Sequence, residues 1–279
     1  MILEENIPVE QAYGTIVSKM RNYFASCGKS RAVLGLSGGI DSALVAAIAR
    51  DALGASNVHG VLMPSQFSSL HSISDSVDLA DNLCIGYDVI PIEKIYKRMM
   101  IEMRDWFESG HWTVAQENLQ ARIRGAILMT YSNRNDALLL NTSNKSELFA
   151  GYGTLYGDMC GAMMVIADLY KVQVYEMARY INRGRTVIPT SIIDKAPSAE
   201  LRPDQKDTDS LPPYEELDPI LHALHEEDLA ADEVIARGAD RTLVERILKL
   251  KKSSSFKVMQ IPPVITVGKK PIAPDFKCI

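Results

Sequence analysis

Apolar residues along the chain follow two patterns, short continuous runs and longer segments with a helical period. Residues 8–27 open with Pro8 and carry apolar side chains three and four positions apart, which is typical of a buried helix face with proline at its start. The short runs predict buried strands at 31–36, 58–64, 87–92 and 137–141, with helices to about residue 53 and over 68–84 between the first three. Because strands and helices alternate about every 25 to 30 residues, the pattern predicts an α/β fold. We expect a parallel sheet with right-handed crossovers and with helices on both faces.

The second half of the chain departs from this alternation. Residues 93–134 predict two helices broken around Gly110, and residues 170–183 predict another. Residues 188–214, called the lid loop below, hold five prolines among many polar residues, which disfavours helix and strand. We expect this loop to be mobile near 199–213, and we expect further helices between it and a proline-rich tail. The pattern is consistent with a single domain of 279 residues whose C-terminal part is helical.

Composition and charge narrow the class of protein. Hydrophobic residues make up 47% of the chain and charged residues 23%, and the net charge is −5. An acidic chain lacks the bulk positive surface that nucleic-acid binding uses, and no apolar run is long enough to cross a bilayer. The first residues are acidic where a signal peptide is basic, and the four cysteines form no CxxC pair. We therefore expect a cytoplasmic protein with reduced thiols and with no nucleic-acid or membrane partner.

The corner after the first strand concentrates residues that suit phosphate binding. The segment LGLSGGIDS places two glycines, two serines and an aspartate between a strand and a helix. Glycines let backbone N–H groups approach a polyanion, and the helix adds the positive end of its dipole. We expect an ATP-binding phosphate loop made of Gly35, Leu36, Ser37, Gly38, Gly39, Ile40, Asp41 and Ser42. An aspartate beside phosphates is favourable only with a cation between them, which predicts Mg²⁺; the alternative is a tight turn capped by Asp41.

This corner is not a Walker A loop, and SGGIDS instead resembles the signature of the N-type ATP pyrophosphatases. Gly28-Lys29-Ser30 precedes a strand and lacks the upstream glycine of a Walker A motif. A second set of motifs is more specific and closely resembles NAD synthetase, above all the synthetase portion of the glutamine-dependent form: ENLQARIRG, TSNKSELFAGYGTLYGD, DKAPSAELRPDQKDTDSLPPYEELD and FKVMQIPP. The resemblance covers roughly residues 10 to 265.

That resemblance implies a fold, a reaction and an assembly. The fold is a Rossmann-like parallel sheet of the adenine nucleotide alpha hydrolase type. In the reaction, the nicotinate carboxylate of deamido-NAD attacks the α-phosphorus of ATP, and ammonia then displaces AMP to leave NAD. ATP is needed because a free carboxylate is too poor an electrophile for ammonia. The assembly is a homodimer, for which the apolar segment 123–131 is the candidate contact helix.

The resemblance also assigns roles to individual residues. Asp41 and Glu147 would hold Mg²⁺ against the pyrophosphate. Asp158 is the candidate catalytic residue, near ammonium and able to help deprotonate it. The ATP contacts beyond the phosphate loop would be Thr142, Lys171 and Ser198. The residues that would bind deamido-NAD are Arg122, Phe256 and Lys257.

Several of these residues also have an ordinary structural interpretation. A lysine at a helix start, such as Lys171, is usually solvated, and an acid there, such as Glu147, is favoured by the helix dipole alone. Arg122 and Arg124 are two positions apart and do not share a helix face, so one of them is expected to be an ordinary surface ion-pair partner.

The nitrogen donor and the alternative functions follow from the same motifs. About 30 residues precede the first predicted strand, too few for the nitrilase-like glutaminase of the glutamine-dependent form. We therefore expect free ammonia, or ammonia delivered by a separate protein, as the nitrogen donor.

Two alternative functions stay open. One is another SGGxDS enzyme, such as a GMP synthetase or a tRNA-modifying adenylase, and the acidic charge and the NKSE and PSAEL segments weigh against it. The other is a noncatalytic nucleotide-sensing domain, which would not need Asp41 and Glu147 together.

Overall fold

The computed structural model describes residues 7–107 and 111–279 and has a parallel sheet at its centre. The strands are β1 (Arg31–Gly35), β2 (Val58–Leu62), β3 (Gly86–Val89), β4 (Ala137–Asn141) and β5 (Met163–Met164). Their order is β3-β2-β1-β4-β5, and every neighbouring pair is parallel. The chain moves outward from β1 to β3 and then crosses to the other side of β1. The strand order therefore reverses between β1 and β4.

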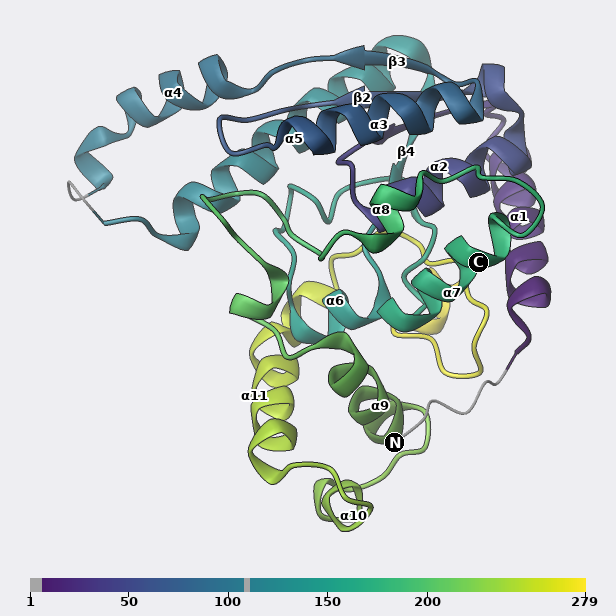
Figure 1. The fold of residues 1–279 in the computed structure, drawn as a ribbon, viewed down its shortest axis with the longest axis vertical. Helices are drawn as coiled ribbons and strands as arrows, with labels where there is room; N and C mark the ends of the chain where they lie inside the picture. The colour runs from purple at the N-terminus through teal and green to yellow at the C-terminus, as the bar shows by residue number, and fades with distance from the viewer. Residues whose placement is uncertain (1–6, 108–110) are drawn as a thin grey trace.

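Helices cover both faces of the sheet, as Figure 1 shows, which confirms the predicted fold class. The helices of these layers are α1 (Val9–Ser26), α2 (Ile40–Leu53), α3 (Leu70–Leu83), α4 (Glu93–Glu102), α5 (Val114–Asn135) and α7 (Lys171–Ile181). Helices α2 and α3 pack on one face with α1 and α7 behind them, and α5 packs on the other face with α4 beside it. Side chains of β1 alternate accordingly, because Ala32 and Leu34 join the core on the α2 side and Val33 joins the core on the α5 side.

A second group of helices lies below the sheet in Figure 1. Its members are α6 (Lys145–Ala150), α9 (Tyr214–His225), α10 (Ala231–Ala236) and α11 (Arg241–Val258). They enclose a hydrophobic core of their own that includes Leu217, Val244 and Ile247. Because α6 follows β4 after three residues, it joins this helical group to the carboxyl edge of the sheet. Within the described ranges, no helix is both long and apolar enough to cross a membrane.

Some details differ from the sequence prediction, and one prediction lies outside the described residues. The pattern does not predict β5, which is two residues long and is held partly by the tail, where Met164 N donates to Pro263 O at 2.7 Å. The lid loop contains a short helix, α8 (Thr190–Asp194). The third strand ends at Val89, three residues before its predicted end. The predicted helix break at Gly110 lies outside the described residues.

The proposed contact segment 123–131 faces mainly the sheet. Ile123 is 5% exposed and belongs to the core between α5 and the sheet, whereas Met129 is 39% exposed. Its exposed positions are Ala126, Met129 and Thr130. The apolar character of this segment is therefore explained largely by packing within the chain.

Candidate active site

A pocket of about 290 Å³ opens at the carboxyl ends of β1 and β4. The strand order reverses there, and parallel α/β sheets bind ligands at such switch points. The phosphate loop, the ends of β2 and β4, α5 and part of the lid loop form its walls. The predicted site residues that line it are Gly35, Leu36, Ser37, Gly39, Ile40, Asp41, Ser42, Thr142, Glu147, Asp158, Lys171 and Ser198.

The phosphate loop is closed by its own serines and packs against α3. Ser42 Oγ accepts a hydrogen bond from Ser37 N at 3.2 Å and donates one to Gly39 O at 3.0 Å. Gly38 has a φ of +75°, and a Cβ atom at this position would lie 2.4 Å from Ser72 O of α3. Only glycine satisfies both the backbone angle and this close contact. The loop thus depends on Gly38 for its shape, although Gly38 itself does not line the pocket.

Asp41 does not cap α2 but faces the far side of the site. Helix α2 begins at Ile40 without a side-chain hydrogen bond at its N-cap, so the interpretation of Asp41 as a cap is wrong. Lys171 Nζ donates a short hydrogen bond to Asp41 Oδ2, and Asn144 Nδ2 donates to Asp41 Oδ1 at 2.9 Å. Glu147 Oε1 lies 3.8 Å from the same Lys171 Nζ. Lys171 is 1% exposed, so the interpretation of Lys171 as a solvated residue is also wrong.

The electrostatics of this group favour a further cation. Burial and the charge of Asp41 raise the pKa of Glu147 well above its ordinary value, while Lys171 opposes the shift. Burial alone would lower the pKa of Lys171, but Asp41 and Glu147 more than offset it, and the pKa is raised. Among the described residues, no group of three or more His, Cys, Asp or Glu side chains is arranged to hold a metal ion. Two carboxylates nevertheless suit Mg²⁺, which in nucleotide sites takes its other ligands from phosphates and water.

A third carboxylate, Asp207 of the lid loop, lines the same pocket. It is 4% exposed, and Tyr214 OH donates to its Oδ2 at 3.0 Å. Within the described residues its Oδ1 has no hydrogen-bond partner. Burial raises the pKa of Asp207, and Lys171 opposes that shift. The sequence motif RPDQKDTD contains three acids with no pattern to separate them, so only the fold identifies Asp207 as the buried one.

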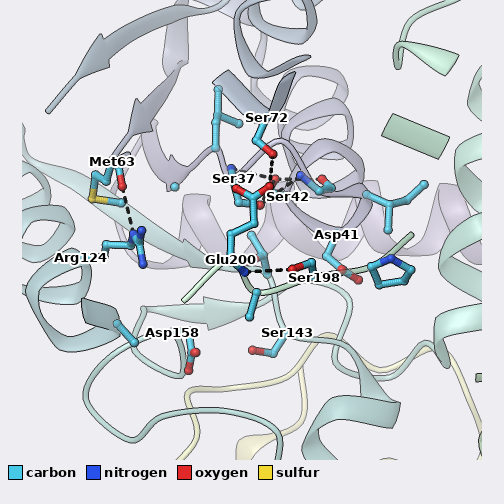
Figure 2. Close-up of a pocket in the computed structure, with 18 of the residues that line it drawn as sticks. Ser37, Asp41, Ser42, Met63, Ser72, Arg124, Ser143, Asp158, Ser198 and Glu200 are labelled. Atoms are coloured by element: carbon cyan, nitrogen blue, oxygen red, sulfur yellow. Dashed lines mark hydrogen bonds between the residues drawn. The ribbon is translucent and has the colours of Figure 1, made fainter. Parts of the chain in front are cut away.

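Asp158 and Arg124 also line the pocket, and Figure 2 shows them on the side away from Asp41. Burial raises the pKa of Asp158 to about 6, against the opposing hydrogen bond from Thr154 N. Arg124 Nε donates to Met63 O at 3.1 Å, and burial lowers its pKa to about 10, so the side chain stays cationic at neutral pH. Of the two neighbouring arginines, Arg124 is therefore the one that faces the pocket. The sequence separates their faces but does not say which face is turned inward.

The three residues predicted to bind deamido-NAD lie outside the pocket lining. Arg122 is exposed, and its Nε donates to Leu155 O at 3.3 Å. Phe256 is 56% exposed on α11. Lys257 Nζ donates to two backbone carbonyl oxygens of the 151–153 turn, at 2.7 Å each. These side chains could meet only a part of a ligand that extends beyond the pocket.

The NKSE motif is explained by four different contacts around α6. Asn144 caps the helix with its side chain, and the Glu147 carboxylate accepts a hydrogen bond from Asn144 N, forming a capping box. Ser146 Oγ donates to Asp218 Oδ1 at 2.5 Å. Lys145 is 1% exposed and turns into a buried group of carboxylates. Glu147 is therefore both a helix-start acid and a residue of the pocket.

Comparison with known proteins agrees with this geometry. A family model described as NAD synthase matches residues 12–261. The glutamine-dependent NAD(+) synthetase of Synechocystis sp. is 48% identical over 261 residues, covering 94% of this chain and 47% of that protein. The solved glutamine-dependent NAD+ synthetase of Acinetobacter baumannii, in complex with ADP, is 36% identical with a TM-score of 0.66, covering 98% of this chain and 50% of that one. The NH3-dependent NAD synthetase of Campylobacter jejuni, in complex with nitrate, is 31% identical with a TM-score of 0.73, covering 90% and 96%.

The chain spans about half the length of the curated relatives it matches. The matched residues include all five strands, the phosphate loop, the NKSE motif and the lid loop. The resemblance carried by these motifs is confirmed, and this chain belongs to the NAD synthase family.

Proposed function

We propose that this chain catalyses the ATP-dependent amidation of deamido-NAD to NAD with ammonia, releasing AMP and pyrophosphate, as the last step of NAD biosynthesis in the cytoplasm. The convergence of Asp41, Glu147 and Lys171 on the edge of the phosphate loop carries this proposal. A noncatalytic nucleotide-sensing domain would not need Asp41 and Glu147 together. A site that releases pyrophosphate needs cationic groups where negative charge develops, and these acids recruit and orient them.

The residues of the pocket divide between the two steps of the reaction. For adenylation, the phosphate loop would hold the ATP phosphates, with Lys171, Thr142 and Ser198 as further contacts. Asp41 and Glu147 would hold Mg²⁺, which when bound neutralises charge on the leaving pyrophosphate. Lys171, which lies between these acids, would be the cationic contact to a phosphate oxygen.

For amidation, Asp158 is the proposed base. A carboxylate whose pKa is raised to about 6 is ionised at neutral pH yet accepts a proton more readily than an ordinary aspartate. It could take a proton from ammonium beside the adenylate. Arg122, Phe256 and Lys257 are the proposed contacts to deamido-NAD, and the cationic Arg124 is available to an anionic group inside the pocket.

We also propose a homodimer, in which deamido-NAD binds near the interface. The exposed positions of Arg122 and Phe256, outside the pocket of one chain, support a site that a second copy helps to complete. We expect light scattering to give the mass of two chains at micromolar concentration. A fully active monomer under those conditions would exclude this arrangement.

The nitrogen donor is tested by a product assay with deamido-NAD, Mg-ATP and either ammonium or glutamine. We expect ammonium to give NAD, AMP and pyrophosphate, and glutamine freed of ammonia to give little NAD. Hydrolysis of glutamine needs an activated nucleophile. The four cysteines are unpaired, and burial raises the pKa of the Cys160 and Cys278 thiols, which makes them poorer nucleophiles.

The controls of this assay separate the competing functions. ATP that is bound but never converted to AMP would indicate a nucleotide-sensing domain, and glutamine-driven NAD formation at the ammonium rate would indicate an unrecognised amidase site. With saturating ammonium, the rate should fall as pH drops through about 6, because Asp158 is protonated below its raised pKa. At limiting ammonium the rate should rise with pH, since more of it is present as ammonia.

A further inference from the structure

The lid loop is attached to the start of α3 by the carboxylate of Glu200, at the rim of the candidate active site (Figure 2). Glu200 Oε1 accepts hydrogen bonds from Ser72 Oγ at 2.7 Å and Ser69 Oγ at 2.9 Å. Its Oε2 accepts a third from Ser69 N at 3.2 Å. A carboxylate at this position also interacts favourably with the positive end of the α3 dipole. One side chain of the loop therefore satisfies three donors of the helix.

A lysine of the same loop reaches the same serine. Lys195 Nζ donates to Ser72 Oγ at 2.7 Å and lies 3.8 Å from Asp75 Oδ2. The Ser72 hydroxyl thus accepts from a cation and donates to the carboxylate of Glu200. Charge-assisted hydrogen bonds of this kind are stronger than neutral ones, and here two of them meet on one hydroxyl.

The backbone of Glu200 shows that these contacts hold the loop in a defined shape. Its φ is +47°, in the left-handed region that is unfavourable for a residue with a Cβ atom. Glu200 N donates to Ser198 Oγ at 3.1 Å, and Ser198 Oγ donates to Gln205 O at 2.6 Å. Ser198, a predicted ATP contact, therefore organises the loop internally, while Glu200 is one of the residues that attach the loop to α3.

Ser72 connects this attachment to the phosphate loop. Its carbonyl oxygen is packed so closely against Gly38 that a Cβ atom there would lie 2.4 Å away. Gly38 in turn stands between Ser37 and Gly39, whose atoms close the phosphate loop. Closely packed groups cannot move independently, so a displacement of the first turn of α3 would alter the loop.

We propose that Glu200 is a positioning residue that latches the lid loop onto α3 and, through Ser72, holds the phosphate loop in its ATP-binding shape. This inference rests on the proposed function only in naming ATP as the nucleotide. The latch forms within the chain itself, so part of the closed state exists before ATP binds. ATP then binds a site that is already largely assembled, and loss of the latch reduces the fraction of competent molecules.

The test compares Glu200→Gln with Asp204→Asn, a matched loss of charge in the same loop. Asp204 is exposed and also has a left-handed φ, of +51°, which asparagine tolerates. In the protein without nucleotide, we expect amide hydrogen exchange across residues 199–211 to be faster in Glu200→Gln and unchanged in Asp204→Asn. Titration with Mg-ATP alone should show a Kd raised roughly tenfold for Glu200→Gln, since charge-assisted hydrogen bonds are lost. The kcat at saturating ATP should change much less.

A second variant tests the same attachment from the α3 side, without changing Glu200. Ser72→Ala should give the same faster exchange and weaker Mg-ATP binding, and the double variant should be little worse than either single one. Unchanged exchange in both single variants would overturn the latch. Faster exchange with unchanged Mg-ATP affinity would overturn its coupling to the phosphate loop. If the wild-type protein forms no NAD from deamido-NAD, the proposed function fails, while the exchange and Mg-ATP measurements still decide this inference.

Discussion

Asp41→Asn and Glu147→Gln should each reduce the rate of NAD formation by roughly a thousandfold, equivalent to about 4 kcal/mol of transition-state stabilisation. Both carboxylates face the Lys171 ammonium at the edge of the phosphate loop. If these acids hold Mg²⁺ as proposed, removing either charge would weaken that hold and would also remove a partner of Lys171. Steady-state assays over a range of Mg²⁺ concentrations measure the effect, and the variants should need more Mg²⁺ than the wild type.

The fold should survive both substitutions, because each amide keeps the shape of the acid and one counter-charge to Lys171 remains. Circular dichroism and thermal unfolding check this. Asp78→Asn, which removes an exposed carboxylate from α3, is the control and should keep the wild-type rate. Near-normal rates at low Mg²⁺ in both site variants would show that these acids do not hold the metal.

Lys145→Met should lower the free energy of unfolding by about 3 to 5 kcal/mol, because it leaves buried carboxylates without a counter-charge. Lys145 Nζ donates to Asp168 Oδ1 at 3.0 Å and to Glu226 Oε1 at 2.5 Å, and both lysine and aspartate side chains are 1% exposed. Asp168 Oδ2 also accepts from the backbone N–H groups of the 267–268 segment, at 2.7 Å each. The group therefore ties α6, the end of α9 and the tail together.

Urea unfolding followed by fluorescence measures this loss. Lys97→Met is the matched control, since Lys97 is 63% exposed and pairs with Glu93 on the same helix. Exposed pairs contribute little, so the control should show no resolvable change. A similar small effect for Lys145→Met would mean that solvent reaches the Asp168 group and that it does not hold the tail in place.

Features that depend on near neighbours in the chain were predictable from the sequence. The helical period placed α1, α2, α3 and α7, and the spacing of short apolar runs predicted the parallel sheet. The phosphate loop follows from glycines between a buried strand and a helix, and the +75° φ of Gly38 supplies the physical reason. β5 escaped prediction because two residues cannot show a period, and its partners are β4 and the distant tail.

The chemistry of the site was decided by tertiary structure. Asp41 and Lys171 are 130 residues apart, and only the placement of β4 beside β1 brings α6 and α7 to the phosphate loop. Burial then decides the role of each side chain. Lys171, at a helix start, is a buried counter-charge, and Asp207 is the buried acid among the similar acids of its motif. Local sequence determines backbone shape through sterics and hydrogen bonds within a few residues. The charge, solvation and pairing of a side chain depend on which segments the strand order brings together. For Arg122 and Arg124, this tertiary arrangement decides which of the two faces the pocket.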